Sequence, residues 1–280
     1  MHTKRSRVVS VVIPVHCHTP EHEVFLAEAL DSVARQSFRD FETIIVDDAS
    51  PRDISPIIRA VDGLPDLRII RNQTNLGHAA SRNIGIEAAR GELIAFLDHD
   101  DTWLPGKLEL QVAALLENPD AAMAFCEVEI LGDCPAGRYV DQATVPLRPG
   151  LAWMLSHNNP VISVSAALVR KQAMLDIGLF DGRYSSCDDF DAWIKLRRRA
   201  PIMHLSHTLA KYRLHRHNLN YAVDRLNDNR LLTRLIIDCL RELSTAERLV
   251  VLPTLARKLA GRIVLTFRGR LSRRLRGSTT

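Results

Sequence analysis

The sequence lacks the features that mark membrane-spanning, zinc-ribbon and disulfide-stabilised proteins. No apolar run approaches the ~20 residues needed to cross a bilayer. The five cysteines are an odd number, lie far apart and form no Cys-x-x-Cys pair, which argues against a zinc ribbon or a disulfide framework and fits a reducing compartment. Aromatic residues make up only 5% of the 280 residues, but 46% hydrophobic and 25% charged residues are an ordinary globular composition. The length allows one large domain, or one domain with an appendage.

The N-terminal residues imitate a signal peptide without completing one. Basic residues precede the apolar run VVSVVIPV, but Pro14, His16 and Cys17 end that run early, and no small-x-small cleavage site follows. We interpret residues 8–15 as a first strand and expect a cytoplasmic protein.

The net charge of +4 conceals an asymmetry between the body of the chain and its end. Residues 248–280 contain nine Lys and Arg and no acidic residue, which leaves 28 basic against 33 acidic residues in the remainder, a net charge of −5. Leu249, Leu252, Leu255 and Leu259 recur at helical spacing among these arginines. Two interpretations stay open: the apolar stripe packs against the body, or the segment lies on an anionic membrane at the cytoplasmic face, as a peripheral protein does.

Strand and helix patterns alternate through the first hundred residues. We expect strands at 8–15, 41–46, 67–70 and 93–97, and helices between them, the last running over 79–90 and ended by Gly91. This alternation predicts an α/β fold, with a Rossmann-like, mostly parallel sheet flanked by helices. Ligands of such sheets bind at the carboxyl ends of the strands.

The rest of the chain is less regular. We expect strands at 121–131 and 161–169, a loop at 134–150, a helix at 188–199, and helix from Asp224 onwards with a break at Pro253. We therefore predict a catalytic domain over residues 1–220 and a helical, basic C-terminal extension over 221–280.

Acidic residues follow the fourth expected strand directly, as Asp98-His99-Asp100-Asp101. Two carboxylates separated by one residue can contact a hard divalent cation from one side and leave positions for phosphate oxygens. The alternative is an acidic turn that caps the next helix, for which Pro105 is well placed as a first residue.

Two further segments suit a nucleotide. Asp48 follows the second strand and could accept a hydrogen bond from a base, or else cap the helix that begins near Ile54. Small residues and Arg82 lie near the start of the helix after Asn75, where a diphosphate would be favoured, although a plain turn explains the small residues equally well.

Asp188 and Asp189 lie at the expected start of a helix. They could cap that helix, or one of them could take a proton from an attacking hydroxyl as a general base. His215 could contact a metal or a phosphate.

The segments VSVVIPVHC, VDDAS, NLGHAASRNIG, AFLDHDD, IGLFD, DDFDAW and YRLH occur in this order between Val8 and Asn220. In order and spacing the chain resembles the family 2 glycosyltransferases, which have the GT-A fold. The resemblance implies inverting transfer of a sugar from a nucleotide-diphosphate sugar, with a UDP-sugar favoured, to a hydroxyl of a glycan, a polysaccharide or a lipid-linked saccharide, assisted by Mn²⁺ or Mg²⁺.

The resemblance also assigns roles to residues. It implies that Pro14 to His16 line the nucleobase and that Asp48 recognises it. It also implies that Asp98 lies near the ribose and that Asp98, Asp100 and His215 lie at the metal. Asp189, beside Asp188, would be the base. The chain departs from the family pattern at His16-Cys17, where an aromatic residue and Asn are usual, and at Asp188, where Glu is usual.

Three other functions were weighed. A sugar nucleotidyltransferase would carry a Gly-rich basic loop after the first strand, where this chain has PVHCHTPEHE. A nucleotide-sugar-binding protein without turnover would not need Asp100, Asp189 and His215 together. Nucleic-acid binding has no supporting motif.

Overall fold

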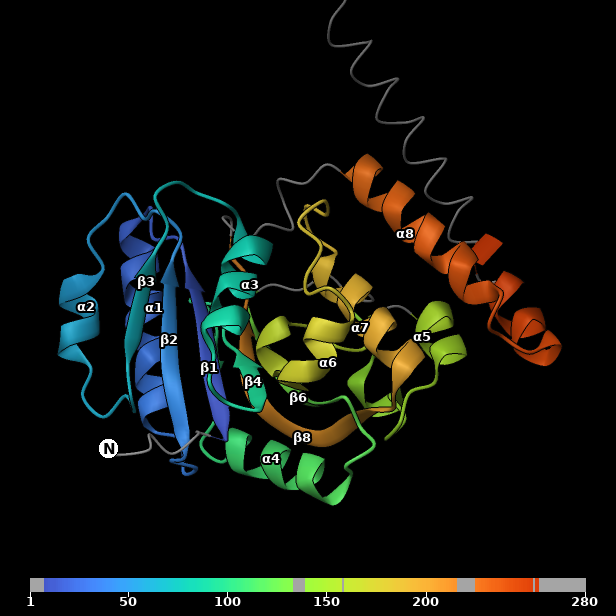
Figure 1. The fold of residues 1–280 in the computed structure, drawn as a ribbon, viewed down its shortest axis with the longest axis horizontal. Helices are drawn as coiled ribbons and strands as arrows, with labels where there is room; N and C mark the ends of the chain where they lie inside the picture. The colour runs from blue at the N-terminus through green and yellow to red at the C-terminus, as the bar shows by residue number, and fades with distance from the viewer. Residues whose placement is uncertain (1–7, 133–138, 158, 216–224, 254, 257–280) are drawn as a thin grey trace, which may run out of the picture.

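The computed structural model describes residues 8–132, 139–157, 159–215, 225–253 and 255–256. Within them, an eight-stranded sheet has the order β3-β2-β1-β4-β7-β6-β8-β5, and four of its seven strand pairs are parallel. Helices flank the sheet, and α8 lies at the edge of the molecule beside α5 and α7 (Figure 1). The prediction of an α/β fold with a mostly parallel sheet and a helical C-terminal extension is confirmed.

The first half of the sheet is parallel throughout. It contains β1 (Val9–Val15), β2 (Phe41–Asp47), β3 (Arg68–Arg71) and β4 (Leu93–Phe96), connected by α1 (Pro20–Ala34), α2 (Ser55–Ala60) and α3 (His78–Ala88). β1 and β2 are buried along their whole length, as their β-branched runs predict. The strand order reverses between β1 and β4. Open α/β sheets bind ligands beside the carboxyl ends of the two strands at such a reversal.

The second half is mixed. β7 (Ala167–Arg170) runs antiparallel between β4 and β6 (Met123–Leu131), and β8 (Ile202–Arg213) runs parallel to β6. The two-residue strand β5 (Thr102–Trp103) pairs with β8. The helices are α4 (Lys107–Glu117), α5 (Leu151–His157), α6 (Lys171–Asp176), α7 (Asp188–Arg199) and α8 (Arg225–Leu240), with short 3-10 turns at Gln142–Thr144 and Val164–Ala166.

Several sequence-based expectations about element boundaries are wrong. Of the strand expected at 161–169, only the last three residues are strand, in β7. The residues before them form the 3-10 turn Val164–Ala166, which Ser163 caps. Gly91 does not end α3, which stops at Ala88; a Cβ at position 91 would lie 2.7 Å from the backbone of β1, so the glycine permits close approach. Pro105 does not begin α4, which starts after Gly106 in the left-handed conformation.

α3 packs unusually close to β1, and this contact positions the site. A Cβ at Gly85 would lie 2.3 Å from Cγ1 of Val12. Because glycine lacks that atom, α3 reaches the strand, and its N-terminal half lies at the carboxyl ends of β1 and β4 (Figure 1).

The chain after α8 differs from the sequence-based expectation. Residues 241–244 form a turn, and helix resumes at residues 245–253, where Ser244 and Glu247 form a reciprocal capping box and Pro253 does not break the helix. Val251 and Leu255 are buried, whereas Leu249 and Leu252 of the expected stripe are exposed. The basic residues from Arg257 onwards lie outside the described residues. In the part that is described, no helix is both long enough and apolar enough to span a membrane.

Candidate active site

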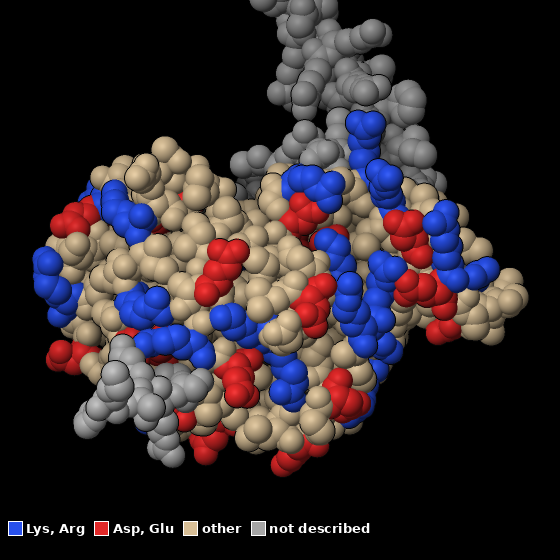
Figure 2. Space-filling view, in the orientation of Figure 1, with Lys and Arg blue, Asp and Glu red and all other residues tan. Residues whose placement is uncertain are grey.

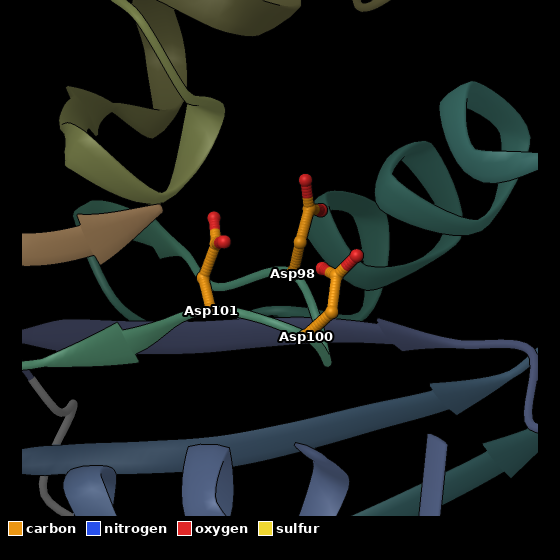
Figure 3. A group of neighbouring side chains, drawn as sticks. All are labelled: Asp98, Asp100 and Asp101. Carbon is orange, nitrogen blue, oxygen red and sulfur yellow. The ribbon is translucent and has the colours of Figure 1, made fainter. Parts of the chain in front are cut away.

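Three carboxylates share the turn between β4 and β5. Asp98, Asp100 and Asp101 each offer an oxygen within 4.8 Å of the others, and Figure 3 shows the three side chains leaving the turn on the same side. The predicted Asp98 and Asp100 pair is thus brought together, with Asp101 as an unforeseen third member.

Asp101 is anchored inside the protein. Its carboxylate accepts hydrogen bonds from Ser163 Oγ at 2.7 Å, from Ser165 Oγ at 2.6 Å and from the backbone N–H of Arg213 at 3.0 Å. Burial, with the neighbouring acids, raises the pKa of Asp101 well above its usual value. Asp101 therefore fixes the turn to the second half of the sheet, while Asp98 and Asp100 remain partly accessible.

His215 reaches the turn from the end of β8. Its Nε2 donates to Oδ2 of Asp100 at 2.9 Å. Burial opposes ionisation of Asp100, but the hydrogen bond from His215 and the nearby His99 outweigh it and keep the pKa of Asp100 below its usual value. Carboxylate oxygens with an adjacent imidazole are ligands that Mn²⁺ and Mg²⁺ accept, so these residues fit a divalent cation.

Arg82 connects the acidic turn to α7. The side chain is 5% exposed, donates twice to Asp98, at 2.8 and 3.0 Å, and once to Asp188, at 3.1 Å. The sequence suggested Arg82 as a diphosphate contact; in this structure its guanidinium bridges two carboxylates. Asp98 and Asp188 are consequently bound to the same cation, the guanidinium of Arg82.

Asp188 and Asp189 have different surroundings. Asp188 is bound on both oxygens, by Arg82 and by Nε2 of His78 at 2.9 Å. Burial opposes its ionisation, but the His78 and Arg82 contacts keep the pKa of Asp188 below its usual value. Asp189 accepts from Asn159 Nδ2 at 3.0 Å, and burial together with the charge of Asp188 raises the pKa of Asp189 to about 7. A carboxylate with that pKa is suited to general-base work near neutral pH.

Asp48 lies at the end of β2 and does not cap α2. Its two oxygens accept from Asn72 Nδ2 and from the backbone N–H groups of Leu76 and Gly77, each at 2.8 Å. Asp48 thus holds the loop that enters α3, where Gly77 has φ 88°. Nδ1 of His16 lies 2.9 Å from the carbonyl oxygen of Asp48, which places His16 beside this loop.

Pro14 and the histidines near it complete the surroundings. Pro14 is buried in β1 opposite Val46. The rings of His16, His18, His22, His99 and His215 follow one another at centroid distances of 4.3 to 5.7 Å. Burial lowers the pKa of His22 to about 4, so the His22 ring at the centre of this cluster is neutral at physiological pH.

Sequence reasoning missed the partners of the predicted residues. His78, Asn159, Ser163 and Ser165 each bond an acidic side chain of the site, and none of them stands in a local pattern that predicts this. Their contacts join positions 110, 30, 62 and 64 residues apart, so only the folded chain reveals them.

Comparisons with known proteins identify relatives of this chain. The model of glycosyl transferase family 2 matches residues 10–178. An uncharacterized glycosyltransferase of Haemophilus influenzae is 28% identical over 193 residues, which are 68% of this chain but only 62% of that protein.

Two solved structures share the fold. S. aureus TarS 1–349 in complex with UDP-GlcNAc has a TM-score of 0.72 and 22% identity, over 90% of this chain and 72% of that one. A mannosyltransferase from Pyrobaculum calidifontis, in complex with GDP-Man and Mn²⁺, has a TM-score of 0.62 and 17% identity, over 96% of this chain and 81% of that one. These likenesses establish the GT-A fold. Because the family model covers more than half of its length, the chain belongs to glycosyl transferase family 2.

Proposed function

We propose that this protein transfers a sugar from a nucleoside-diphosphate sugar to a hydroxyl group of a saccharide or lipid-linked saccharide, with inversion at the anomeric carbon. One observation carries the proposal: Arg82 joins the acidic turn, which suits a cation, to Asp188. The residue next to Asp188 is Asp189, whose pKa is about 7. Family membership supports the reaction class, and the structural neighbours were solved with UDP-GlcNAc or GDP-Man.

The donor is assigned to the carboxyl ends of β1, β2 and β4. On this proposal Pro14 and His16 line the nucleobase, Asp48 recognises it, and Asp98 lies near the ribose. A UDP-sugar is the favoured donor, since the better-matching of the two solved structures holds UDP-GlcNAc. Arg82 lies beside the diphosphate on this proposal and also fixes Asp98, to which its Nη2 donates twice.

Asp98, Asp100 and His215 would hold Mn²⁺ or Mg²⁺. A divalent cation bound there supplies positive charge that offsets the charge of the departing nucleoside diphosphate. Asp101 would not need to ligate it, since two serine hydroxyls and a backbone N–H already occupy that carboxylate.

Asp189 acts as the base in this mechanism. Its carboxylate takes the proton of the acceptor hydroxyl as that oxygen forms a bond to the anomeric carbon, and the bond from that carbon to the diphosphate oxygen breaks with its electron pair on the diphosphate. The attack comes from the face opposite the leaving group, so one displacement inverts the configuration. Asp188 keeps its negative charge beside Asp189 and thereby raises the affinity of Asp189 for the proton.

The surroundings of the reaction are also proposals. The charge of residues 248–280 supports a place at the cytoplasmic face of an anionic membrane, where a lipid-linked acceptor would be presented. We assign the transfer reaction to residues 1–220 and membrane contact to the extension over 221–280.

Thermal unfolding in the presence of nucleotide-sugars tests the proposal. A ligand that binds the native state raises stability by RT ln(1 + [L]/Kd), so a panel of UDP-, GDP-, dTDP- and ADP-sugars with Mn²⁺ should contain a clear best donor. Release of nucleoside diphosphate from that donor then reports turnover. Stabilisation by a donor without turnover would indicate a binding protein, release of pyrophosphate from sugar phosphate and nucleoside triphosphate would indicate a nucleotidyltransferase, and no stabilisation by any donor would refute the assignment.

A further inference from the structure

The helix that follows α8 turns its apolar side outward. Six exposed residues without charge share one face: Ala246, Leu249, Val250, Leu252, Pro253 and Ala256, called here the outer face. At 3.6 residues per turn, Val251 and Leu255 lie on the opposite side, and both are buried against the protein. The helix therefore has apolar residues on both sides, of which only one is covered by the described part of the chain.

The exposure of the outer face is large for aliphatic side chains. Leu249, Val250 and Leu252 are 71%, 66% and 47% exposed. Large aliphatic residues that are neighbours on a surface mark a site of interaction, unlike the scattered ones found on any protein.

The acidic residues near the outer face are engaged within the chain. Glu247 accepts from Ser244 in the capping box, Glu242 pairs with Arg198, and Asp238 lies 3.6 Å from Arg241. The charges of Glu242 and Asp238 are offset by these arginines, so they oppose contact with an anionic partner less than free carboxylates would, whereas Glu247 keeps its charge.

Positive charge also lies near the outer face. Arg230 and Arg234 are exposed along the adjacent α8, and Figure 2 shows a row of blue side chains over that helix. Arg241 and Arg248 also line, with Leu240 and Leu252, a cavity of about 280 Å³ between α8 and the following helix. The sequence after Ala256 adds eight more Lys and Arg and no acid.

We propose that the outer face is the surface by which this protein docks on an anionic lipid bilayer, with its aliphatic side chains in the interface and the flanking cations on the headgroups. An aliphatic face combined with a polybasic segment supplies the two signals that stable peripheral binding requires. A soluble acidic protein would match the cations but would leave the aliphatic face uncovered. This inference rests on the membrane contact that we propose for the extension, but not on the proposed sugar transfer.

Vesicle co-sedimentation of the full-length chain tests the inference. The lipid-facing variant is Leu249→Gln/Val250→Gln/Leu252→Gln, since Gln preserves helix propensity while removing the aliphatic surface. The matched control is Leu110→Gln/Leu116→Gln/Leu175→Gln, which alters three exposed leucines of α4 and α6.

With vesicles of phosphatidylcholine and phosphatidylglycerol, the wild type and the control should bind, and the lipid-facing variant should bind at least about tenfold more weakly. Binding of the wild type should fall at high salt and on vesicles of phosphatidylcholine alone. Equal binding of all three proteins, or no binding by the wild type, would overturn the inference.

Two further measurements keep the result interpretable. Thermal unfolding shows whether the triple variant is folded, and if it is not, Leu249→Gln alone should still weaken binding, because that side chain makes the largest exposed contribution. Light scattering after size exclusion reports association: a wild-type dimer that the triple variant converts to a monomer, with no vesicle binding, would assign the outer face to a second copy of this chain and overturn the membrane inference.

Discussion

The charge of Asp188 controls the pH at which Asp189 can act as a base. Asp189 must be deprotonated to accept a proton, so transfer should be lost as pH falls through its pKa of about 7. Asp188→Asn removes the adjacent negative charge with little change of shape. Arg82, which Asp188 now shares with Asp98, would also be less neutralised. Both effects favour the ionised form of Asp189, so its pKa should fall.

The size of the change follows from electrostatics. Two charges roughly 7 Å apart at an effective dielectric constant of about 20 interact by ~2 kcal/mol, which is equivalent to about 1–2 pKa units. Burial is the larger cause of the raised pKa and is unchanged by the substitution. The midpoint of the acidic limb should therefore move from near pH 7 to about pH 5–6, and not to the value of a free aspartate.

The assay is the pH dependence of kcat/KM for release of nucleoside diphosphate, which reports the free enzyme. Asp189→Asn should keep donor stabilisation in thermal unfolding but lower turnover by about 10²- to 10⁴-fold and abolish the limb. A wild-type profile that is flat below pH 7, or a midpoint that Asp188→Asn does not move, would refute the reasoning. If Asp188→Asn lowers turnover more than Asp189→Asn at every pH, the base is Asp188.

Three other predictions concern the metal site and the core. Asp100→Ala should abolish Mn²⁺-dependent donor stabilisation while the unfolding transition without ligands stays cooperative; near-normal turnover with Mn²⁺ would contradict the metal assignment. Gly85→Ala should destabilise by about 1–3 kcal/mol in denaturant titration because its Cβ meets Val12, and adding Val12→Ala should recover part of that loss rather than add to it. Lys107, whose Nζ donates to Gln111 at 2.7 Å, is fully buried, and burial lowers its pKa to about 8. Between pH 8 and 10.5 the unfolded chain therefore binds more protons than the folded chain, so the stability of the wild type relative to Lys107→Met should rise by about 3 kcal/mol across that range. A constant difference in stability would show that the pKa of the amine is not perturbed.

The sequence was most informative where one local pattern determines the structure. The β-branched run at 8–15 has no polar period, which predicts a strand buried on both faces, and β1 is buried along its whole length. The position of Asp98 and Asp100 after a strand predicted a site at the carboxyl edge of the sheet, whereas Asp188 and Asp189 were assigned to that site only by the family resemblance. The structure gathers Asp98 and Asp188 around one guanidinium.

The sequence was less informative where polar residues serve distant partners. Most of β8 was not predicted, because His204, Ser206 and His207 interrupt its apolar positions and much of the strand is only half buried. Most of the strand expected at 161–169 was wrong for a related reason: Ser163 caps a 3-10 turn over residues 164–166, and Ser163 and Ser165 bond Asp101, a partner that no local pattern reveals. The capping box of Ser244 and Glu247, in contrast, is a local signal that could have placed the last helix start.

The contacts between β8 and the acidic turn also imply an order of assembly during synthesis. Asp100 and Asp101 are bound by His215 and by the backbone of Arg213, 115 and 112 residues further along the chain. At roughly 5–20 residues per second, a ribosome would need about 6–23 s to make that intervening chain. The parallel half of the sheet can form in that time, but its acidic turn gains its last two partners only with β8. A nascent or truncated chain that ends before β8 would thus have Asp98 bound by Arg82 and Asp101 bound by Ser163 and Ser165, whereas Asp100 would lack the imidazole of His215 and be open to free divalent cations until translation has passed residue 215.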